Sequence, residues 1–218
     1  LGDQETNLVL PSKFIPSAER YNLMAKIDQW VITSAFKSLQ KIAAFSQKTV
    51  ALSINLSGIS MSDMELLTFI NQQLKIYSIN ASNICFEITE TTAISDISNA
   101  KMLINELKKI GCEFALDDFG SGFSSLAYLK NLPIDYLKID GEFIREIADD
   151  PISEAMVQSI HQIARVLGMK TIAEFVENDV IRKKIAKIGV DYIQGNGIAE
   201  PFPISELLDP DNINSCLK

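Results

Sequence analysis

Residues 114–126 read FALDDFGSGFSSL, and this stretch decides the fold. Apolar or small residues lead into two adjacent carboxylates, Asp117 and Asp118, and a loop rich in glycine and serine follows. This order predicts a buried strand that ends in a charged site. Because side chains alternate across a strand, the two aspartates can converge on a cation only if the backbone bends at the strand's end. The alternative is that Asp118 merely starts a turn, since Asp and Gly favour turns.

The composition is that of a folded domain. The chain has 218 residues, 47% of them hydrophobic, and its mean hydropathy is +0.12. We expect a single α/β domain over residues 1–218 that ends in a tail of roughly ten residues. A net charge of −8 argues against a binder of DNA or RNA polymers. The negative charge does not exclude a ligand that contains phosphate, provided that the protein also binds cations.

Membrane and redox signals predict a cytoplasmic location. No apolar run approaches the roughly 18 to 20 residues of a membrane span, and no basic start with an apolar core marks a signal peptide. The chain has an odd number of cysteines, and their spacing is not that of a metal site: they are Cys85, Cys112 and Cys216. This cysteine usage is typical of a protein in a reduced compartment. A longer parent protein with a membrane anchor stays open.

Strand and helix patterns alternate along the chain. Apolar, β-branched runs predict six strands, at residues 49–56, 84–88, from 114, 136–139, 170–173 and 191–193. Helical spacing of apolar residues predicts helices at 63–77, 98–110, 124–129, 151–167 and 180–188, and one or two within 14–45, where Leu23, Ile27, Trp30 and Val31 share a period. Such alternation predicts parallel strands joined by crossovers, the α/β fold of a barrel.

Polar groups follow every predicted strand at its carboxyl end. In chain order they are Asn55, Glu87 with Glu90, Asp117 with Asp118, Lys138 with Asp140, Glu174 with Glu177, and Gln194. In a closed α/β barrel the carboxyl ends of the strands form the face that carries the active site. Chance is the competing explanation, because strands end where loops begin. The repetition of acidic, amide and ammonium groups favours a site.

The candidate ligands are all oxygen donors. Four carboxylates and an amide suit Mg²⁺ or Mn²⁺ better than zinc or copper, and the ligand set is Asn55, Glu87, Asp117, Asp118 and Glu174. The only histidine, His161, lies in the middle of a predicted helix, where packing or solvation is expected rather than ligation. One aspartate can bridge two ions that clamp a phosphoryl displacement, and Lys138 can orient the attacking water. The set therefore predicts phosphodiester hydrolysis.

Six motifs follow one another along the chain: SINLSG at 53–58, FEITE at 86–90, ALDDFGSGFSSL at 115–126, LPIDYLKID at 132–140, IAEFVE at 172–177 and YIQG at 192–195. In order and spacing they resemble the motifs of EAL domains, the bacterial phosphodiesterases that linearise cyclic di-GMP. FIPSAERYNL at 14–23 also resembles the helix after the family's first motif. The resemblance implies a modified TIM barrel, of which about six strand–helix units are visible here.

The resemblance also implies a role for each matched residue. Asn55, Glu87 and Asp117 match metal ligands, with Asp117 as the bridge, and Asp118 belongs to the second ion. Glu174 matches a second-metal ligand that is also a general base, and Lys138 matches the lysine that holds the nucleophilic water. Gln194 and Asp140 match positions near the substrate. Glu90 is expected to brace the loop at 119–125, which the family links to dimerisation and to control of metal binding.

The chain departs from the family pattern in three places. The name-giving Glu-Ala-Leu motif, with its ligand glutamate and a nearby substrate-binding arginine, does not precede Phe14. We therefore expect the chain to begin inside the domain, with a sensory or cyclase domain further upstream in the parent protein. Phe175 stands where a smaller residue is usual in the family. Asn196 stands where an aromatic residue is common, and this change is expected to weaken the packing of a purine.

Two other functional hypotheses stay open. A receptor could bind cyclic di-GMP in a catalytically impaired pocket and signal through its dimer contacts, although every visible ligand is retained. A fragment that lacks part of its barrel could do neither, because an open sheet exposes its edges. For the enzyme we expect cyclic di-GMP as substrate and a homodimer as the assembly.

Overall fold

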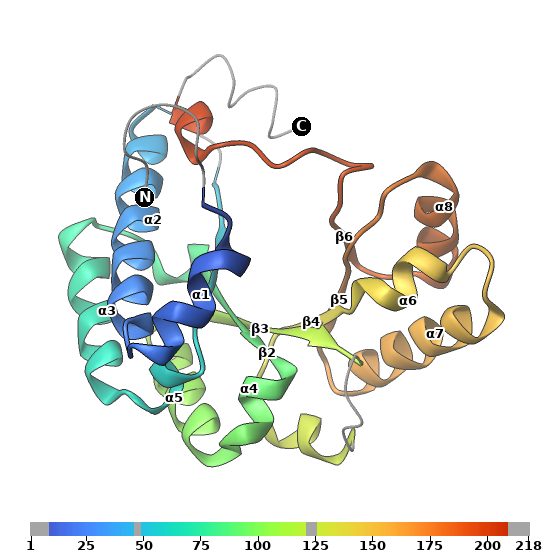
Figure 1. The fold of residues 1–218 in the computed structure, drawn as a ribbon, viewed down its shortest axis with the longest axis horizontal. Coiled ribbons are helices and arrows are strands. Elements are labelled where there is room, and N and C mark those ends of the chain that lie inside the picture. Colours follow the sequence, from blue (N-terminus) through green and yellow to red (C-terminus); the bar gives the residue numbers. More distant parts are fainter. Residues whose placement is uncertain (1–8, 46–48, 121–125, 209–218) are drawn as a thin grey trace.

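Six parallel strands form one curved sheet in the computed structural model, which describes residues 9–45, 49–120 and 126–208 (Figure 1). The strands are β1 (Leu52–Asn55), β2 (Ile84–Thr89), β3 (Glu113–Phe119), β4 (Tyr136–Ile139), β5 (Lys170–Ala173) and β6 (Tyr192–Ile193). Their order in the sheet is their order in the chain. The prediction of an α/β barrel-type fold with six parallel strands is confirmed.

Helices connect successive strands and lie around the outside of the sheet (Figure 1). The longer ones are α1 (Pro11–Arg20), α2 (Met24–Phe45), α3 (Met64–Ile76), α5 (Ile97–Lys109), α7 (Pro151–Val166) and α8 (Asp179–Ile188). Two six-residue helices, α4 (Glu90–Ser95) and α6 (Gly141–Glu146), follow β2 and β4 directly and were not predicted. The short helix expected at 124–129 is the 3₁₀ helix η3 (Leu126–Asn131), and residues 121–125 lie outside the described ranges. The other 3₁₀ helices are η1 (Ile59–Ser62), η2 (Ala81–Asn83) and η4 (Ile204–Leu208).

Side chains of Asp and Asn fix where several helices begin. Asp63, Asp96, Asp150 and Asn178 are N-caps, and each accepts a hydrogen bond from a backbone N–H in the first turn. Those N–H groups have no partner within the helix, so a capping oxygen stabilises the helix start. Gly189 ends α8 in the left-handed conformation, with φ of 93°. Local chemistry thus sets the length of the crossovers.

The two faces of the sheet differ in character. One face carries fully buried apolar residues that pack against the helices in a single core, among them Phe86, Phe114, Leu116, Leu137, Ile139 and Ala173. Successive residues of a strand point to opposite sides, so the alternate residues face away from this core. The alternate residues include Glu87, Asp117 and Lys138, so charged side chains lie on the face away from this core.

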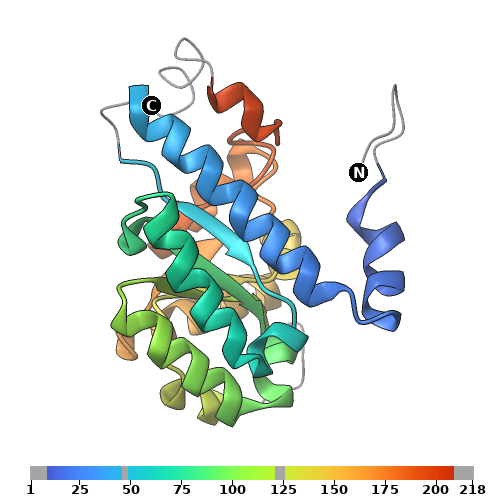
Figure 2. The same ribbon diagram turned by 90° about the vertical axis from the view of Figure 1, so that its left-hand side faces the viewer.

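The buried side of α2 is a single stripe of mostly apolar residues. In α2 the buried residues are Met24, Asp28, Ile32, Phe36, Leu39 and Ile42, whereas Trp30 is 68% exposed. The helical spacing of Leu23, Ile27, Trp30 and Val31 predicted one or two helices within 14–45, and α1 and α2 confirm it. Leu23 and Trp30 are nevertheless exposed, because apolar residues lie on more than one side of this region. Figure 2 shows α1 standing off from the rest of the molecule, and Ala18 is its one buried residue.

Candidate functional site

Strand register places the predicted ligands on one face of the sheet. Asn55 pairs with Glu87, and Glu87 pairs with Ala115, two residues before Asp117. Ala115 also pairs with Tyr136, two residues before Lys138, and Lys138 pairs with Ile172, two residues before Glu174. Because side chains repeat every two residues, all of these groups point away from the helix-covered core. Parallel pairing therefore brings residues from five strands to one edge.

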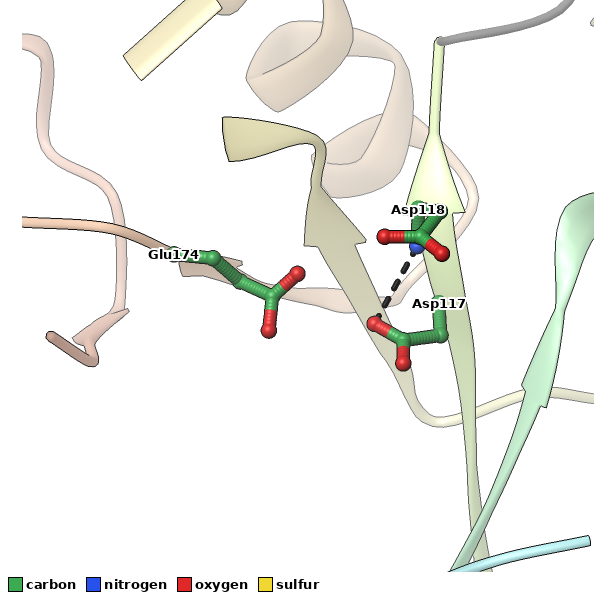
Figure 3. Close-up of side chains that lie close together, drawn as sticks. All are labelled: Asp117, Asp118 and Glu174. Atoms are coloured by element: carbon green, nitrogen blue, oxygen red, sulfur yellow. Dashed lines mark hydrogen bonds between the residues drawn. The ribbon is translucent and has the colours of Figure 1, made fainter. Parts of the chain in front are cut away.

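A β-bulge at the end of β3 adds Asp118 to this face. Leu116 pairs with Leu137 and Phe119 with Ile139, so three steps along β3 match two steps along β4. The extra residue lets Asp118 adopt a left-handed backbone conformation with φ of 54°, and its N–H donates to Asp117 Oδ1 at 3.1 Å. Figure 3 shows Asp117, Asp118 and Glu174 lying close together. The backbone bend that convergence required is present.

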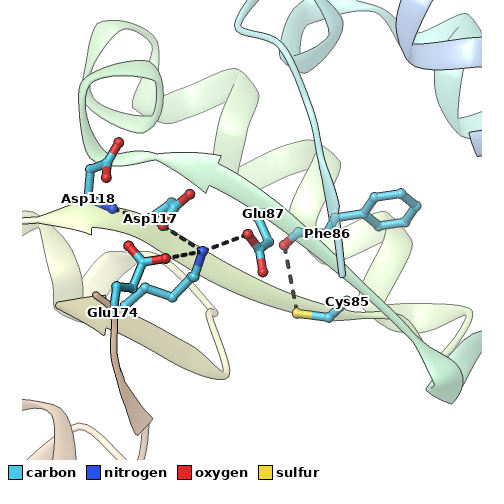
Figure 4. Close-up of polar contacts among 7 residues, drawn as sticks. Cys85, Phe86, Glu87, Asp117, Asp118 and Glu174 are labelled. Atoms are coloured by element: carbon cyan, nitrogen blue, oxygen red, sulfur yellow. Dashed lines mark hydrogen bonds and ion pairs between the residues drawn. The ribbon is translucent and has the colours of Figure 1, made fainter. Parts of the chain in front are cut away.

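Three carboxylates converge on the ammonium group of Lys138. Its Nζ lies 2.8 Å from Glu87 Oε2, 2.8 Å from Asp117 Oδ1 and 2.9 Å from Glu174 Oε1 (Figure 4). An ammonium has three N–H donors, so each of them has a charged acceptor. Lys138, Glu87 and Glu174 are buried, which makes these interactions less screened than pairs at the surface. Lys138 thus links the ends of β2, β3 and β5.

Burial and charge shift the titration of these groups. Burial disfavours the ammonium of Lys138, but Glu87 and Asp117 outweigh it and raise the pKa of Lys138 above its ordinary value. Burial raises the pKa of Glu174 to about 7, although the hydrogen bond from Lys138 acts in the opposite direction. Burial and then Asp117 raise the pKa of Asp118. The site therefore concentrates negative charge that a further cation would relieve.

Glycines beyond β6 shape the backbone around Glu174. Gln194 N–H donates to Ala173 O at 2.8 Å and Val176 N–H donates to Gln194 O at 3.0 Å, so residues 174 and 175 are held between two hydrogen bonds. A Cβ on Gly195 would lie 2.4 Å from Val176 N, which only glycine avoids. Phe175 has φ of 51°, a strained conformation for a bulky residue. The close approach of the two segments turns Glu174 toward Asp117.

A cavity of about 370 Å³ opens beside Glu174. Its lining includes Phe175, Glu177, Gln194, Gly195 and Asn196. The Arg145 guanidinium lies 3.9 Å from the centre of the Phe175 ring, and the same ring covers the position where a Cβ on Gly141 would project. Phe175 therefore contacts the start of α6 and also forms a wall of this cavity.

Glu90 holds the segment that follows the bulge. Its Oε2 accepts from Gly120 N–H at 3.0 Å, and its Oε1 accepts from the Tyr128 hydroxyl at 2.5 Å. Glu90 and Tyr128 are both buried, so these charge-assisted bonds join the start of α4 to the end of β3 and to η3. Most of the loop that Glu90 was expected to brace, residues 121–125, lies outside the described residues.

The remaining predicted residues lie around this cluster. Asn55 ends β1 beside Glu87, and its side chain is exposed. Asp140 caps α6 through a 2.7 Å bond from Glu142 N–H, so its carboxylate already has a structural use. His161 is packed as expected, with Nδ1 2.8 Å from Thr171 Oγ1. Sequence reasoning missed Tyr128 and the buried Asp28. Asp28 carried a signal, since it precedes Ile32 by four residues on the buried stripe of α2.

Two observations bear on the wider setting of the chain. Cys85 and Cys112 are buried free thiols, and burial raises the pKa of both to about 12, while Cys216 lies outside the described residues. Over residues 9–45, 49–120 and 126–208, no helix has the length and apolar character needed to cross a membrane.

A model of one protein family matches most of this chain. The EAL domain model covers residues 1–201. Cyclic di-GMP phosphodiesterase PdeB of Shewanella oneidensis is 43% identical over 198 residues, which are 91% of this chain and 23% of that protein. Cyclic di-GMP phosphodiesterase PdeF of Escherichia coli is 38% identical over 208 residues, 94% of this chain and 27% of that protein. This chain belongs to the EAL domain family, and it spans about a quarter of the length of these relatives.

Solved structures of EAL domains share the fold. The MucR phosphodiesterase in complex with cyclic di-GMP is 32% identical, with a TM-score of 0.86 over 91% of this chain and 81% of that one. The FimX EAL domain of Xanthomonas citri, also in complex with cyclic di-GMP, is 26% identical, with a TM-score of 0.85 over 90% and 78% of the two chains.

Proposed function

We propose that this chain is a metal-dependent phosphodiesterase that hydrolyses cyclic di-GMP to linear pGpG in bacterial signalling. The observation that carries the proposal is the convergence of Glu87, Asp117 and Glu174 on Lys138, with Asp118 beside them. Two relatives are named as cyclic di-GMP phosphodiesterases, and two structural neighbours are complexes with that nucleotide. Membership of the family and an acidic site at the expected edge thus support the same activity.

The donor set fits a hard divalent cation. Asp117, Asp118 and Glu174 each offer an oxygen atom within 4.8 Å of the others. Oxygen ligands without histidine or cysteine suit Mg²⁺ or Mn²⁺. We assign Asn55, Glu87 and Asp117 to one ion, and Asp118 and Glu174 to a second, with Asp117 shared. When bound, such a pair supplies an activated water and stabilises charge on the phosphate oxygens.

Lys138 and Glu174 are the protein groups that we assign to the chemistry. The product pGpG keeps a 5′-phosphate, so the water oxygen bonds to phosphorus while the bond from phosphorus to the 3′-oxygen breaks. Once its carboxylate partners turn to the ions that they would hold, an N–H of Lys138 would be free to donate a hydrogen bond to the water, and a Glu174 oxygen would accept the water's proton. The departing 3′-oxygen gains a proton and becomes the hydroxyl of the linear product. These roles need the two groups close together, and they lie 2.9 Å apart.

Substrate binding is assigned to the rim beside this cluster. Gln194 lines the 370 Å³ cavity next to Glu174 and offers both an amide donor and an acceptor. Asp140 lies at the start of α6, two residues beyond Lys138. Glu90 accepts hydrogen bonds from Gly120 N–H and the Tyr128 hydroxyl, and so restrains the backbone that follows Asp118.

Turnover by the 218-residue chain tests the proposal. Purified protein is incubated with cyclic di-GMP and Mg²⁺ or Mn²⁺, and chromatography measures pGpG. We expect product that EDTA abolishes. We expect Asp117→Asn to lower the rate by at least about a hundredfold, since it removes a charge from the carboxylates that would hold the ions. The matched control is Asp179→Asn, which changes an exposed carboxylate in the first turn of α8.

If no turnover is found, nucleotide binding distinguishes a receptor from an incomplete site. If the chain binds the nucleotide but forms no product with any divalent ion, the protein is a receptor for cyclic di-GMP and not an enzyme. A lack of both binding and turnover would favour a chain that needs further residues to complete its site.

We further propose that the chain works within a longer protein and as a homodimer. The relative MucR of Pseudomonas aeruginosa is named as a bifunctional diguanylate cyclase and phosphodiesterase, and this chain spans 29% of its length. A sensory or cyclase domain is therefore the partner that we expect in the parent protein. Light scattering of the purified chain measures its mass, and a monomeric mass at micromolar concentration contradicts the dimer.

A further inference from the structure

Asp28 interrupts the buried stripe of α2. The stripe continues from Asp28 to Ile32 and Phe36 at intervals of four residues, and both of those apolar residues are fully buried. Asp28 itself is only 4% exposed, although a carboxylate costs free energy when it leaves water. A charge at such a position persists only where hydrogen bonds compensate it, so its partners indicate what it does.

One oxygen of Asp28 binds the turn that follows β1. Its Oδ2 accepts from Ser57 N–H at 3.0 Å, from the Ser57 hydroxyl at 2.7 Å and from the Ser60 hydroxyl at 2.6 Å. Hydrogen bonds to an ionised acceptor are shorter and stronger than neutral ones. Asp28 thus joins α2 to the first turn after the strand and to η1.

This turn begins two residues after Asn55. On one side β1 is fixed by β2, since Asn55 pairs with Glu87 and Leu56 N–H donates to Glu87 O at 2.9 Å. Within the described sheet, β1 has no second neighbour, because it stands at the end of the strand order. The bonds to Asp28 therefore supply the restraint on the carboxyl end of β1 that a second strand would otherwise provide.

We propose that Asp28 is a positioning residue, which fixes the carboxyl end of β1 so that the Asn55 side chain meets a divalent ion together with Glu87 and Asp117. The inference rests on the proposed function, because it takes Asn55 as an ion ligand. The hydrogen bonds of Asp28 come from Ser57 and Ser60 and not from the residues assigned to the ion. It acts through Ser57, Ser60 and the backbone of residues 55–57.

The test is Mn²⁺ affinity, measured by paramagnetic resonance on the 218-residue chain without nucleotide. Asp28→Asn keeps the shape of the side chain but removes its charge, and we expect affinity to fall about tenfold, as for other residues that orient ligands. Ser60→Ala removes one of the three bonds and leaves Asp28 with the other two. We therefore expect this variant to fold and to give a smaller loss of the same sign.

Two controls separate positioning from general destabilisation. Ile185→Val weakens the core at a fully buried residue of α8, remote from β1, and should leave Mn²⁺ affinity unchanged. In an Asn55→Ala background, Asp28→Asn should cost no further affinity, because the residue through which it acts is already gone.

The outcomes have distinct meanings. Wild-type Mn²⁺ affinity in both Asp28→Asn and Ser60→Ala would overturn the inference, as would a tenfold loss that persists in the Asn55→Ala background. Absence of Mn²⁺ binding by the wild-type chain would instead overturn the proposed function. A loss confined to chains that retain Asn55 supports Asp28 as the residue that positions it.

Discussion

Three carboxylates converge on Lys138, and removal of its charge should be costly when no metal is present. Methionine preserves much of the side-chain length but leaves Glu87, Asp117 and Glu174 without a partner. Removing one member of a buried ion pair typically costs about 3–5 kcal/mol of stability. We expect Lys138→Met to lose a comparable amount in EDTA, measured by urea unfolding.

Added Mg²⁺ should restore part of that loss, since an ion can balance the same carboxylates. The matched control is Lys109→Met, because Lys109 is an exposed lysine whose partner Glu106 lies three residues earlier on the same helix. This substitution should change stability by less than about 0.5 kcal/mol. Equal stability of Lys138→Met and Lys109→Met in EDTA would contradict the role of Lys138 as counter-ion.

Asp191 stabilises the opposite end of the sheet in a pH-dependent way. Its Oδ2 accepts from Thr171 N–H at 2.8 Å and from the Thr171 hydroxyl at 2.9 Å. That hydroxyl has one proton, so it must accept from His161 Nδ1–H at 2.8 Å. Burial acts to raise the pKa of Asp191, but the bonds from Thr171 outweigh it and lower the pKa below its ordinary value.

A lowered carboxyl pKa in the folded state gives stability that is present above the unfolded value, about 3.9, and is lost as pH falls. Asp191→Asn should therefore be less stable than the wild type at pH 7, and the difference should shrink as the pH falls below that value. Urea midpoints at neutral and acidic pH measure it. A difference that does not change with pH would contradict this assignment.

The sequence indicated which residues gather at the site better than it indicated how they contact one another. The acidic groups after each strand were visible in the sequence, because they follow apolar runs. The bulge that turns Asp118 beside Asp117 was not, because it arises from the pairing of β3 with β4, to which residues far along the chain contribute. The three carboxylates around Lys138 likewise come from β2, β3 and the end of β5.

At the scale of elements, the contact between the ends of β5 and β6 determines where Glu174 points. Gly195 has φ of 154°, and a Cβ there would meet the backbone of Val176. Gly195→Ala must therefore separate two hydrogen-bonded segments, and overpacking of this kind costs about 1–3 kcal/mol. We expect that loss in urea unfolding, together with weaker Mg²⁺ binding, because Glu174 lies between the affected hydrogen bonds.

Gly168→Ala isolates the contribution of backbone conformation. Gly168 also has a positive φ, 77°, but no atom lies within 4 Å of the position of its Cβ. The control should show conformational strain of about 1–2 kcal/mol and unchanged Mg²⁺ affinity. If both variants bound Mg²⁺ equally well, the β5–β6 contact would not position Glu174.

The strands and the longer α-helices were predictable, whereas the two shortest α-helices were not. The six strands appear as apolar runs, and α3, α5, α7 and α8 have clear helical periods with Asp or Asn at the start. The helices α4 and α6 have six residues each, too few to show a period. For α2, the spacing of apolar residues does not predict which face is buried. The buried face contains the charged Asp28, and the exposed face contains the apolar Trp30.

At the scale of the whole molecule, the parallel sheet explains how one edge collects charged side chains that are far apart in the chain. Glu87 and Glu174 are separated by the whole of β3 and β4, yet both contact Lys138. Each crossover helix returns the chain to the same end, so every strand finishes at the same edge. The site therefore exists only in the folded chain, and an ion that needs these ligands together binds the folded state in preference to the unfolded one.

Preferential binding links the metal to global stability. A ligand that binds only the folded state at a hundred times its dissociation constant adds about 2.7 kcal/mol to the free energy of unfolding. We expect Mg²⁺ or Mn²⁺ to raise the thermal midpoint of the 218-residue chain with a dependence on ion concentration that Asp117→Asn largely removes. The comparison with Asp179→Asn excludes general screening, because that exposed carboxylate experiences the same ionic strength. An equal rise in all three proteins would mean that the ion acts through screening and not through the acidic cluster, whereas a rise absent only from Asp117→Asn assigns the stabilisation to the ends of β2, β3 and β5.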